Sequence, residues 1–431
     1  MPKEITIGPD DVDTVDSVEE LFDENAEHEL NAAAKKSLES MTLNLNEDEQ
    51  KLIDSKKDQE VEVLKPDNNW KDNGLSDEEQ VQSDELLDDF SEFLETKADI
   101  SQSSGIIETF PTGVDVLDAI LGGGFACGAF SIIVGEPGTF KSALLAQIIG
   151  TSQKKFNGKL LHKFLDSEEA MTVERGASMG ARRLKISTDI SVEKVFKTIQ
   201  GTMAYKISKG IEDYPAIVAW DSIANTSTDK ERESEETDPA KTMGLKARIL
   251  SSCLPRYISK MRKSNISLIA INQLRDKIDI GQFKTANPLR YLGQNRVMPG
   301  GKAIEYNAFH LLLLKVKSDL KYDQWGFDGV MIDAKCVKNK LFPPNVIIQL
   351  VVDFNTGISN FWTNYNLLVN HKRIQPGAWG KLITCPEVKW QGTKNCLVKY
   401  NENPEFAKEF DAAVQETIQT EIIDRYKAVI E

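Results

Sequence analysis

The sequence is poor in the side chains that many enzymes use for metal or triad chemistry. It has only four histidines, and its five cysteines are scattered, with no pair at CxxC spacing. So few histidines argue against a histidine-based metal centre or catalytic triad. An odd number of scattered cysteines predicts reduced thiols and neither a disulfide framework nor a zinc site.

Long apolar runs are also lacking. No stretch approaches the roughly 18 apolar residues that a membrane span needs, and the start, Met1 to Glu4, lacks the basic and apolar run of a secretory signal. We therefore expect a cytoplasmic protein with no membrane partner.

Basic residues are scarce in the first part of the chain. Residues 1–100 hold 31 acidic and 9 basic residues, a net charge of −22, which leaves +7 of the total of −15 for the other 331. We expect residues 1–104 to be a largely disordered acidic leader with short helices, one of them amphipathic at Ser76–Leu94. This helix is either transient or a docking helix. An acidic leader on a basic body indicates a nucleic-acid-binding core.

From about residue 107 to 354, short apolar runs alternate with helical segments. This alternation predicts an α/β core over 105–357, with a mostly parallel sheet flanked by helices. Residues 358–431 are predicted to form a small C-terminal region that ends in a helix beginning at Asn403-Pro404. The seven apolar runs are Phe130–Val134, Leu160–Leu165, Ala216–Trp220, Ser267–Ile271, Phe309–Lys317, Val330–Val337 and Val346–Val352.

The first of these runs leads into a glycine-containing loop and then a helical segment. Strand, loop and helix in this order are typical of a phosphate-binding P-loop, in which backbone amides and the helix N-terminus face phosphate oxygens. Lys141 is expected to reach the β- and γ-phosphates of ATP, and the Ser142 hydroxyl to bind Mg²⁺. An ordinary strand-to-helix turn is the alternative. The loop reads Gly135, Glu136, Pro137, Gly138, Thr139, Phe140, Lys141, Ser142.

Two further strands end in acidic residues. Asp221 ends the run Ala216–Trp220, and an acid at a strand end beside a P-loop can hold Mg²⁺ through water. Glu168 follows the run Leu160–Leu165 and could polarise an attacking water. From spacing alone, Glu168 is equally well explained as a helix N-terminal acid favoured by the helix dipole.

The segment from Asn272 to Gly301 is long, basic and partly aromatic. Cations interleaved with Phe283 and Tyr291 suit a single-stranded nucleic acid, because the phosphates attract the cations and the bases stack on the rings. The glycine pair Gly300-Gly301 would let backbone amides approach phosphates closely. A plain surface loop is the alternative. The cations are Arg275, Lys277, Lys284, Arg290 and Arg296.

Taken together, these motifs resemble the RecA family over about Pro111 to Gly357. The resemblance includes the lead Leu121–Gly124 into the P-loop, the stretch Met243–Arg248 running on to Ile271–Arg275, and the signature Val337–Lys340. It implies an ATP hydrolase that forms a helical filament on single-stranded DNA and pairs it with homologous duplex DNA. Recombination, repair and replication are the implied processes.

The resemblance also implies roles for single residues. Glu168 would activate water, Asp221 would be the Walker B acid, and Gln273 would sense the γ-phosphate. Lys338 and Lys340 would reach a neighbouring subunit's ATP, although without the resemblance a solvated strand end explains both lysines. Contacts to DNA phosphates are implied for Arg248, Gly300 and Gly301, with loops at Asn225–Thr242 and Leu274–Pro299 flanking the strand.

Phage recombinases of the UvsX type resemble the chain further, because their P-loop also carries phenylalanine at the place of Phe140. A phage-encoded protein would act in the host cytoplasm, with a single-strand-binding protein and a loading mediator as possible partners. Arg175 stands where bacterial members stack a tyrosine on adenine, and a guanidinium can also stack on a base. A ring helicase and a weakly hydrolysing mediator or paralogue stay open as alternatives.

Overall fold

The structure is a computed structural model that describes residues 107–233, 244–276 and 296–427, apart from residues 376 and 378. The described residues all belong to one compact unit, Leu94–Glu431. The predicted acidic leader, including its helix at Ser76–Leu94, lies outside them.

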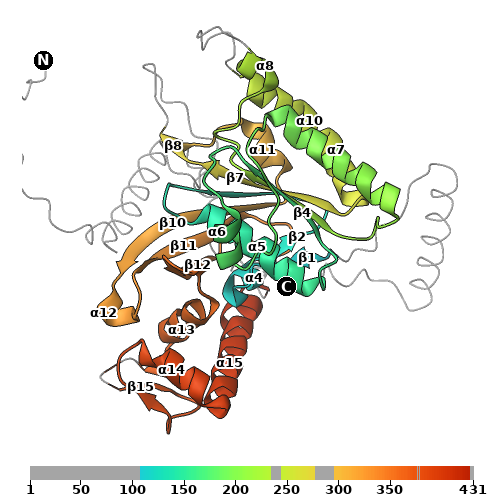
Figure 1. Cartoon of the computed structure of the whole chain (residues 1–431). Helices are drawn as coiled ribbons and strands as arrows, with labels where there is room; N and C mark the ends of the chain where they lie inside the picture. Colours follow the sequence, from blue (N-terminus) through green and yellow to red (C-terminus); the bar gives the residue numbers. More distant parts are fainter. Residues whose placement is uncertain (1–106, 234–243, 277–295, 376, 378, 428–431) are drawn as a thin grey trace, which may run out of the picture. The chain divides into compact units, whose positions relative to one another are not determined.

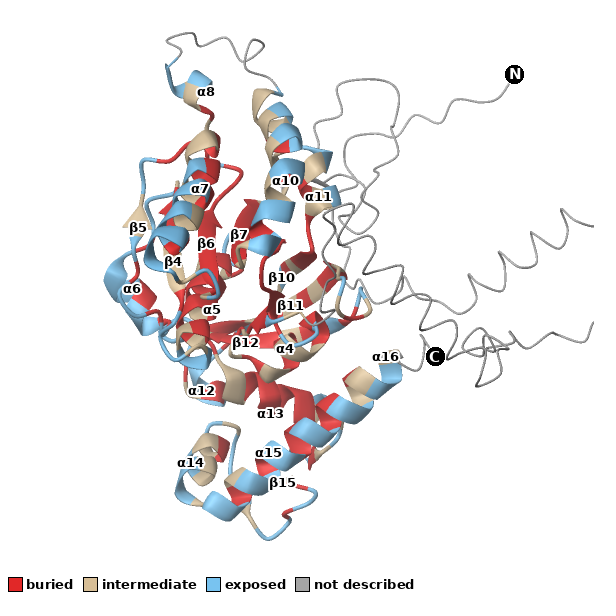
Figure 2. Ribbon diagram, turned by 90° about the vertical axis from the view of Figure 1, so that its right-hand side faces the viewer, coloured by how far each residue is buried: buried red, intermediate tan, exposed pale blue. Residues whose placement is uncertain are grey.

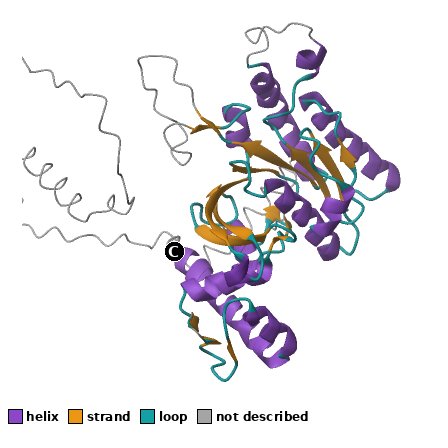
Figure 3. Ribbon diagram, turned by 60° about the vertical axis from the view of Figure 1, so that its left-hand side comes forward, coloured by secondary structure: helices purple, strands orange, loops and turns teal. Residues whose placement is uncertain are grey.

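A nine-stranded sheet forms the centre of this unit (Figures 1 and 3). Each of the seven predicted apolar runs forms one of its strands, and two short strands complete it at the edges. In spatial order the strands are β13 (Gly357–Ile358), β12 (Ile347–Asp353), β11 (Gly329–Lys338), β10 (His310–Leu320), β3 (Phe130–Gly135), β7 (Ile266–Gln273), β6 (Ala216–Asp221), β4 (Leu161–Asp166) and β5 (Ile186–Ser187).

The predicted mostly parallel sheet is confirmed. Five parallel pairings join β10, β3, β7, β6, β4 and β5. The strands β10 to β13 continue the sheet as an antiparallel meander. Only residues 321–328 connect β10 to β11, and this connection is shorter than the dozen or so residues that a parallel crossover needs.

Helices cover both faces of the sheet (Figures 1 and 2). Alternate residues of β3 point to opposite faces, so Ile133 packs in the cluster with α4 (Asp115–Leu121) and α5 (Lys141–Lys155). Its neighbours Ile132 and Val134 pack in a second cluster on the other face. That second cluster includes residues of α7 (Val192–Lys209), α10 (Leu245–Lys263) and α11 (Lys302–Asn307).

The predicted C-terminal helix is confirmed as α15 (Pro404–Ile418). The Asn403 side chain accepts hydrogen bonds from the backbone amides of Glu405 and Phe406, at 3.1 Å each, and so caps the helix. The apolar stripe packs inward as expected, because Phe406, Phe410, Val414, Ile418 and Ile422 are buried. The helix continues through a π-helical segment, η4 (Gln419–Asp424), into α16 (Arg425–Lys427).

The rest of the C-terminal region is a small three-stranded sheet with two helices. The domain boundary near residue 357 stays a prediction. The elements are α13 (Asn360–Asn370), β14 (Ile374–Gln375), β15 (Gly380–Leu382), β16 (Lys389–Trp390) and α14 (Asn395–Glu402).

The remaining described elements are short. Among the described helices, none combines the length and the apolar character needed to cross a membrane. These short elements are β1 (Thr109–Phe110), β2 (Phe125–Ala126), α6 (Val173–Ser178), α8 (Asp229–Glu233), β8 (Arg275–Asp276), β9 (Arg296–Val297) and α12 (Tyr322–Trp325).

Candidate nucleotide site and nucleic-acid interface

The predicted P-loop connects β3 to α5 at the carboxyl end of β3. Gly135 is required by close packing, because a Cβ there would lie 2.5 Å from the Leu314 carbonyl oxygen and 2.8 Å from Thr139 Oγ1. Gly138 has φ +78°, a backbone conformation that glycine adopts without strain. The loop thus brings backbone amides and the N-terminus of α5 to one place, where they can face an anion.

Phe140 occupies the position before the lysine where the motif usually has glycine. It adopts the left-handed conformation, with φ 57° and ψ 29°, which costs a non-glycine residue on the order of 1 kcal/mol. Its ring stacks on Phe354, with ring centroids 5.8 Å apart and planes inclined by 6°. This contact offsets part of the cost and ties the loop to the turn after β12.

Lys141 is the first residue of α5, and its side chain folds back over the loop. Its Nζ donates to the Glu136 carbonyl oxygen at 2.7 Å and to Thr139 Oγ1 at 3.1 Å. Burial lowers its pKa, and the carboxylates of Asp221, Glu168 and Glu136 partly oppose that shift. The ammonium group therefore lies inside the loop, close to three carboxylates.

Ser142 and Asp221 meet beside this lysine. The Ser142 hydroxyl donates to Asp221 Oδ2 at 2.5 Å. Asp221 ends β6 and is buried, and burial raises the pKa of its carboxyl to about 7. A buried carboxylate with a hydroxyl beside it suits Mg²⁺, which prefers oxygen ligands and completes its shell with substrate phosphates and water. Ser142 and Asp221 could hold this ion.

Glu168 lies at the same edge, beyond the end of β4. Its Oε1 accepts hydrogen bonds, each of 2.8 Å, from Ser222 Oγ, Asn225 Nδ2 and Gln273 Nε2. Buried Asp166 accepts the backbone amide of Glu168 at 3.0 Å and so fixes the turn that presents it. Oε2 makes no hydrogen bond with a described residue and is available to a water or substrate.

One pocket of about 260 Å³ at the carboxyl edge of the parallel strands is lined by Lys141, Ser142, Glu168, Asp221 and Gln273. Arg175 of α6 lines it too, so its guanidinium can reach a ligand there. The pocket also includes the Phe140 and Ile271 side chains as apolar walls. In the described part of the chain, no group of three histidine, cysteine or carboxylate side chains could hold a metal ion alone. A metal ion bound here would complete its shell with water or substrate oxygens.

The structure places Lys338 and Lys340 away from this pocket. Lys338 pairs with Leu311 near the start of β10, and the neighbouring residue His310 pairs with Ser131 near the start of β3. Both lysines therefore lie at the edge of the sheet opposite the P-loop. Lys338 Nζ donates to the carbonyl oxygens of Glu305 and Tyr306 in α11, at 2.9 and 2.8 Å. Lys340 Nζ lies 5.5 Å from the centre of the Phe309 ring.

The predicted DNA-contacting segment begins immediately after Gln273. The strands β8 and β9 pair Arg275 with Val297 and Asp276 with Arg296, so the segment leaves and returns to the core through one two-stranded ribbon. Asn272 Nδ2 donates to the Pro299 carbonyl oxygen at 2.7 Å and fixes the ribbon's base. Lys277, Lys284 and Arg290 lie outside the described residues, and Arg275 and Arg296 are described by their backbone alone.

Arg248 and the glycine pair come together at this base. Arg248 is exposed in the first turn of α10. Gly300 and Gly301 have φ +102° and +78°, and a Cβ on Gly301 would lie 3.0 Å from Ala247 Cβ, in the same turn of α10. The chain therefore packs closely against α10 before α11 begins, and the exposed Arg248 lies beside it.

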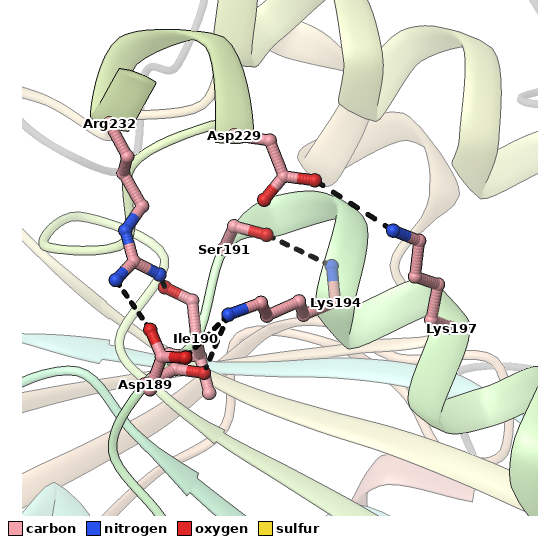
Figure 4. A network of polar contacts seen from close by, with 7 residues as sticks. All are labelled: Asp189, Ile190, Ser191, Lys194, Lys197, Asp229 and Arg232. Atoms are coloured by element: carbon pink, nitrogen blue, oxygen red, sulfur yellow. Dashed lines mark hydrogen bonds and ion pairs between the residues drawn. The ribbon is translucent and has the colours of Figure 1, made fainter.

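The second implied DNA loop, Asn225–Thr242, includes α8, which is fastened to the beginning of α7 (Figure 4). Arg232 and Lys194 both pair with Asp189, at 2.5 and 2.6 Å, and Lys197 lies 3.9 Å from Asp229. Hydrogen bonds from Lys194 and Arg232 hold the pKa of Asp189 below its usual range. The acidic loop that follows, from residue 234 to 243, lies outside the described residues.

Sequence reasoning missed three partners of Glu168. Ser222 and Asn225 were not predicted as site residues, and Asp166 was passed over as the residue that fixes the turn. Ser222 follows Asp221 directly, so its closeness to the pocket could have been inferred. The hydrogen bond between Asn225 and Glu168 joins residues far apart in the chain, and no local pattern indicates it.

A strand, a P-loop and a helix at the carboxyl edge of a parallel sheet define the class of P-loop proteins. Comparison with known proteins narrows this class. The family model of the RecA N-terminal domain matches residues 97–359. Protein RecA of Ehrlichia ruminantium (strain Gardel) is 30% identical over 318 residues, which cover 73% of this chain and 82% of that protein. Protein RecA of Crocosphaera subtropica is 29% identical over 320 residues, covering 73% and 84%.

The chain belongs to the RecA family. Among solved structures, the crystal structure of the RadB recombinase is 20% identical, with a TM-score of 0.37, and the match covers 58% of this chain and 98% of that one. The predicted RecA-like fold is confirmed by the family match together with the sheet described above.

Proposed function

We propose that this protein is a DNA-dependent ATPase that forms filaments on single-stranded DNA and catalyses homologous pairing and strand exchange in recombination and repair. One observation carries the proposal. Lys141, Ser142, Glu168, Asp221 and Gln273 come from four parts of the chain and line one pocket. Gln273 also lies next to the ribbon of β8 and β9, which carries the basic segment Asn272–Gly301.

The arrangement suits ATP hydrolysis. The P-loop amides and Lys141 would hold the phosphates, and Ser142 Oγ and Asp221 would hold Mg²⁺, which supplies positive charge against the phosphate oxygens. Glu168 Oε1 is fixed by three donors, so its free Oε2 has a defined direction. That oxygen would orient the attacking water and accept its proton.

Gln273 would connect the nucleotide to DNA. Its Nε2 holds Glu168 Oε1 at 2.8 Å, and the next two residues lead into β8. A γ-phosphate that draws the Gln273 amide toward itself would move the end of β7 and the ribbon base with it. ATP would in this way favour the DNA-binding form of the segment Asn272–Gly301, with Arg248 and the glycine pair beside it.

Self-assembly would complete the site. Lys338 and Lys340 lie at the sheet edge opposite the pocket, so a head-to-tail neighbour could present them to it. We further propose a phage recombinase of the UvsX type, acting in the host cytoplasm with a single-strand-binding protein and a loading mediator. The stacking of Phe140 on Phe354 supports this, because it shows how the loop accepts a phenylalanine.

The test is ATP hydrolysis by the full chain, with and without single-stranded DNA. We expect turnover that rises with DNA and falls at least 100-fold in Lys141→Ala, since that lysine would neutralise charge at the transferring phosphate. Lys209→Ala, which changes an exposed lysine at the end of α7, is the control and should keep wild-type turnover. Nucleotide binding without turnover would favour the mediator alternative, and closed rings in electron micrographs would favour the helicase.

A further inference from the structure

Six cations gather on a surface that the proposed function does not use. They come from two segments, residues 154–163 and 182–185, neither of which contains an acidic residue. The segments lie side by side, because Gln153 and the Arg182 backbone exchange two hydrogen bonds, of 2.8 and 2.9 Å. The Phe164 amide also donates to the Lys185 carbonyl oxygen at 2.9 Å. We call this set the cation cluster: Lys154, Lys159, Lys163, Arg182, Arg183 and Lys185.

The positive charge of the cation cluster is not neutralised within the described chain. None of the six forms an ion pair with a described residue. Burial and then the like charge of Lys185 lower the pKa of Lys163, and no carboxylate opposes the shift. Mutually repelling cations of this density favour an anionic partner.

Three residues of the cation cluster line a groove of about 520 Å³. Lys154, Arg182 and Arg183 line it with the Asn157 and Gln153 side chains, which are neutral hydrogen-bonding groups. Gly158 and Gly180 also line it, and nothing lies within 4 Å of the position of a Cβ on either. The space above these two glycines is open, so a ligand can approach their backbone closely.

This groove is distinct from both sites described above. Lys154 lies in the last turn of α5, Lys159 lies between α5 and β4, and Arg182 to Lys185 directly precede β5, so the groove flanks the beginnings of β4 and β5. The nucleotide pocket and the ribbon of β8 and β9 instead follow the carboxyl ends of β3, β6 and β7. A ligand in the groove would therefore contact neither the P-loop nor the ribbon.

We propose that the cation cluster binds the phosphate backbone of duplex DNA. Arginine forks and lysines beside open glycines suit phosphate oxygens. The groove lining includes no phenylalanine, tyrosine or tryptophan, so it offers no stacking platform of the kind that favours single strands. Backbone contacts of this type position a duplex without reading its sequence. This duplex site would be a second DNA contact and rests on the proposed function. The experiments below distinguish failure of the duplex site from failure of the proposed function.

The first experiment measures duplex binding by the full chain at several salt concentrations. The variant Lys154→Gln, Arg182→Gln, Arg183→Gln removes three cations of the groove, and each lost phosphate contact should reduce the salt slope by about 0.9. We expect a slope lower by about 2 to 3 and affinity at least tenfold weaker at low salt. The control, Lys209→Gln, Lys321→Gln, Lys372→Gln, changes net charge equally at exposed lysines elsewhere and should retain the wild-type slope.

A second measurement locates the contact directly. Duplex DNA should protect Lys154, Lys159 and Lys185 from acetylation, as read by mass spectrometry, whereas inorganic phosphate at equal phosphate concentration should not. Protection by poly-glutamate but not by duplex, or an unchanged salt slope with altered self-assembly, would overturn the proposal in favour of an acidic protein surface. The groove variant should keep ATP turnover that is stimulated by single-stranded DNA. If the wild-type protein itself showed no such turnover, that result would count against the proposed function and not against the duplex site.

Discussion

Asp221 is the buried carboxylate of the candidate nucleotide site. It ends a central strand, and its carboxyl group has the Ser142 hydroxyl as its donor. Burial raises its pKa to about 7, so the ionised carboxylate that a divalent cation needs forms less readily than at an exposed aspartate. A bound cation would displace the carboxyl proton, because positive charge favours the ionised carboxylate.

The raised pKa of Asp221 predicts a pH dependence of stability. The folded chain binds this proton more tightly than the unfolded chain, so the free energy of unfolding falls as pH rises from about 4 to about 7. Asp221→Asn should flatten this part of the profile, by up to a few kcal/mol. Urea unfolding without nucleotide measures it. Asp319→Asn, at an exposed position on β10, is the control. Equal pH profiles for Asp221→Asn and the wild type would contradict the assignment.

The sequence predicts single residues of the site unevenly. Lys141 and Ser142 are identified by a local motif, and Asp221 by its place at a strand end, because the carboxyl ends of parallel strands share one edge of the sheet. Residue spacing alone does not identify Glu168 as a site residue, because an acid favoured by the helix dipole explains its position equally well. Its partner Asn225 depends on how the chain folds after β6, and no local pattern carries that information.

At the scale of elements, the P-loop is tethered to a distant part of the sheet. Phe140 stacks on Phe354, which follows β12 near the far end of the strand order. Two strands, β10 and β11, separate β3 from β12 in the sheet. The aromatic contact therefore links the phosphate-binding loop to the antiparallel meander.

This contact predicts an energetic coupling between Phe140 and Phe354. The single variants Phe140→Leu and Phe354→Leu and their double variant form a cycle in which the coupling should be about 0.5–1.5 kcal/mol. Because half of the Phe354 side chain is exposed (52%), we expect the lower half of that range. Urea unfolding provides the measurement. A coupling of zero would mean that the two rings stabilise the chain independently.

The elements differ in how far the sequence predicts them. All seven apolar runs form strands, because each is a short run between turns, whereas a helix needs a longer segment. The C-terminal helix was predicted from Asn403 and its apolar stripe. The strands β14 to β16 were not predicted, since two or three residues show no periodicity. α10 continues through Pro255, where its interior position would by itself suggest a break.

At the scale of the whole molecule, the proposed function draws on residues from both ends of the sheet. The P-loop, Glu168 and Asp221 lie at the carboxyl edge of the parallel strands, and Lys338 and Lys340 lie at the opposite edge. One chain cannot bring both sets together without losing its sheet. A head-to-tail neighbour can, and such heterologous contacts extend into open filaments when the rotation does not close.

Mixed assemblies test whether the lysines act on a neighbour. Lys141→Ala and Lys340→Ala should each be inactive in DNA-stimulated ATP hydrolysis. The first variant lacks the P-loop lysine, and the second lacks the cation that each chain would present to its neighbour. In an equal mixture, about one quarter of head-to-tail interfaces should pair an intact P-loop with an intact Lys340, so turnover should recover to about that fraction of the wild-type rate.

The alternative role of these lysines is local support of α11, where Lys338 caps the helix. Lys340 makes no such contact; its ammonium lies over the Phe309 ring. If Lys340 acts only within its own chain, mixing cannot restore turnover, because no chain in the mixture has both lysines. Recovery would show a site shared between subunits, and two variants that stay inactive when mixed would place the role of Lys340 within a single chain.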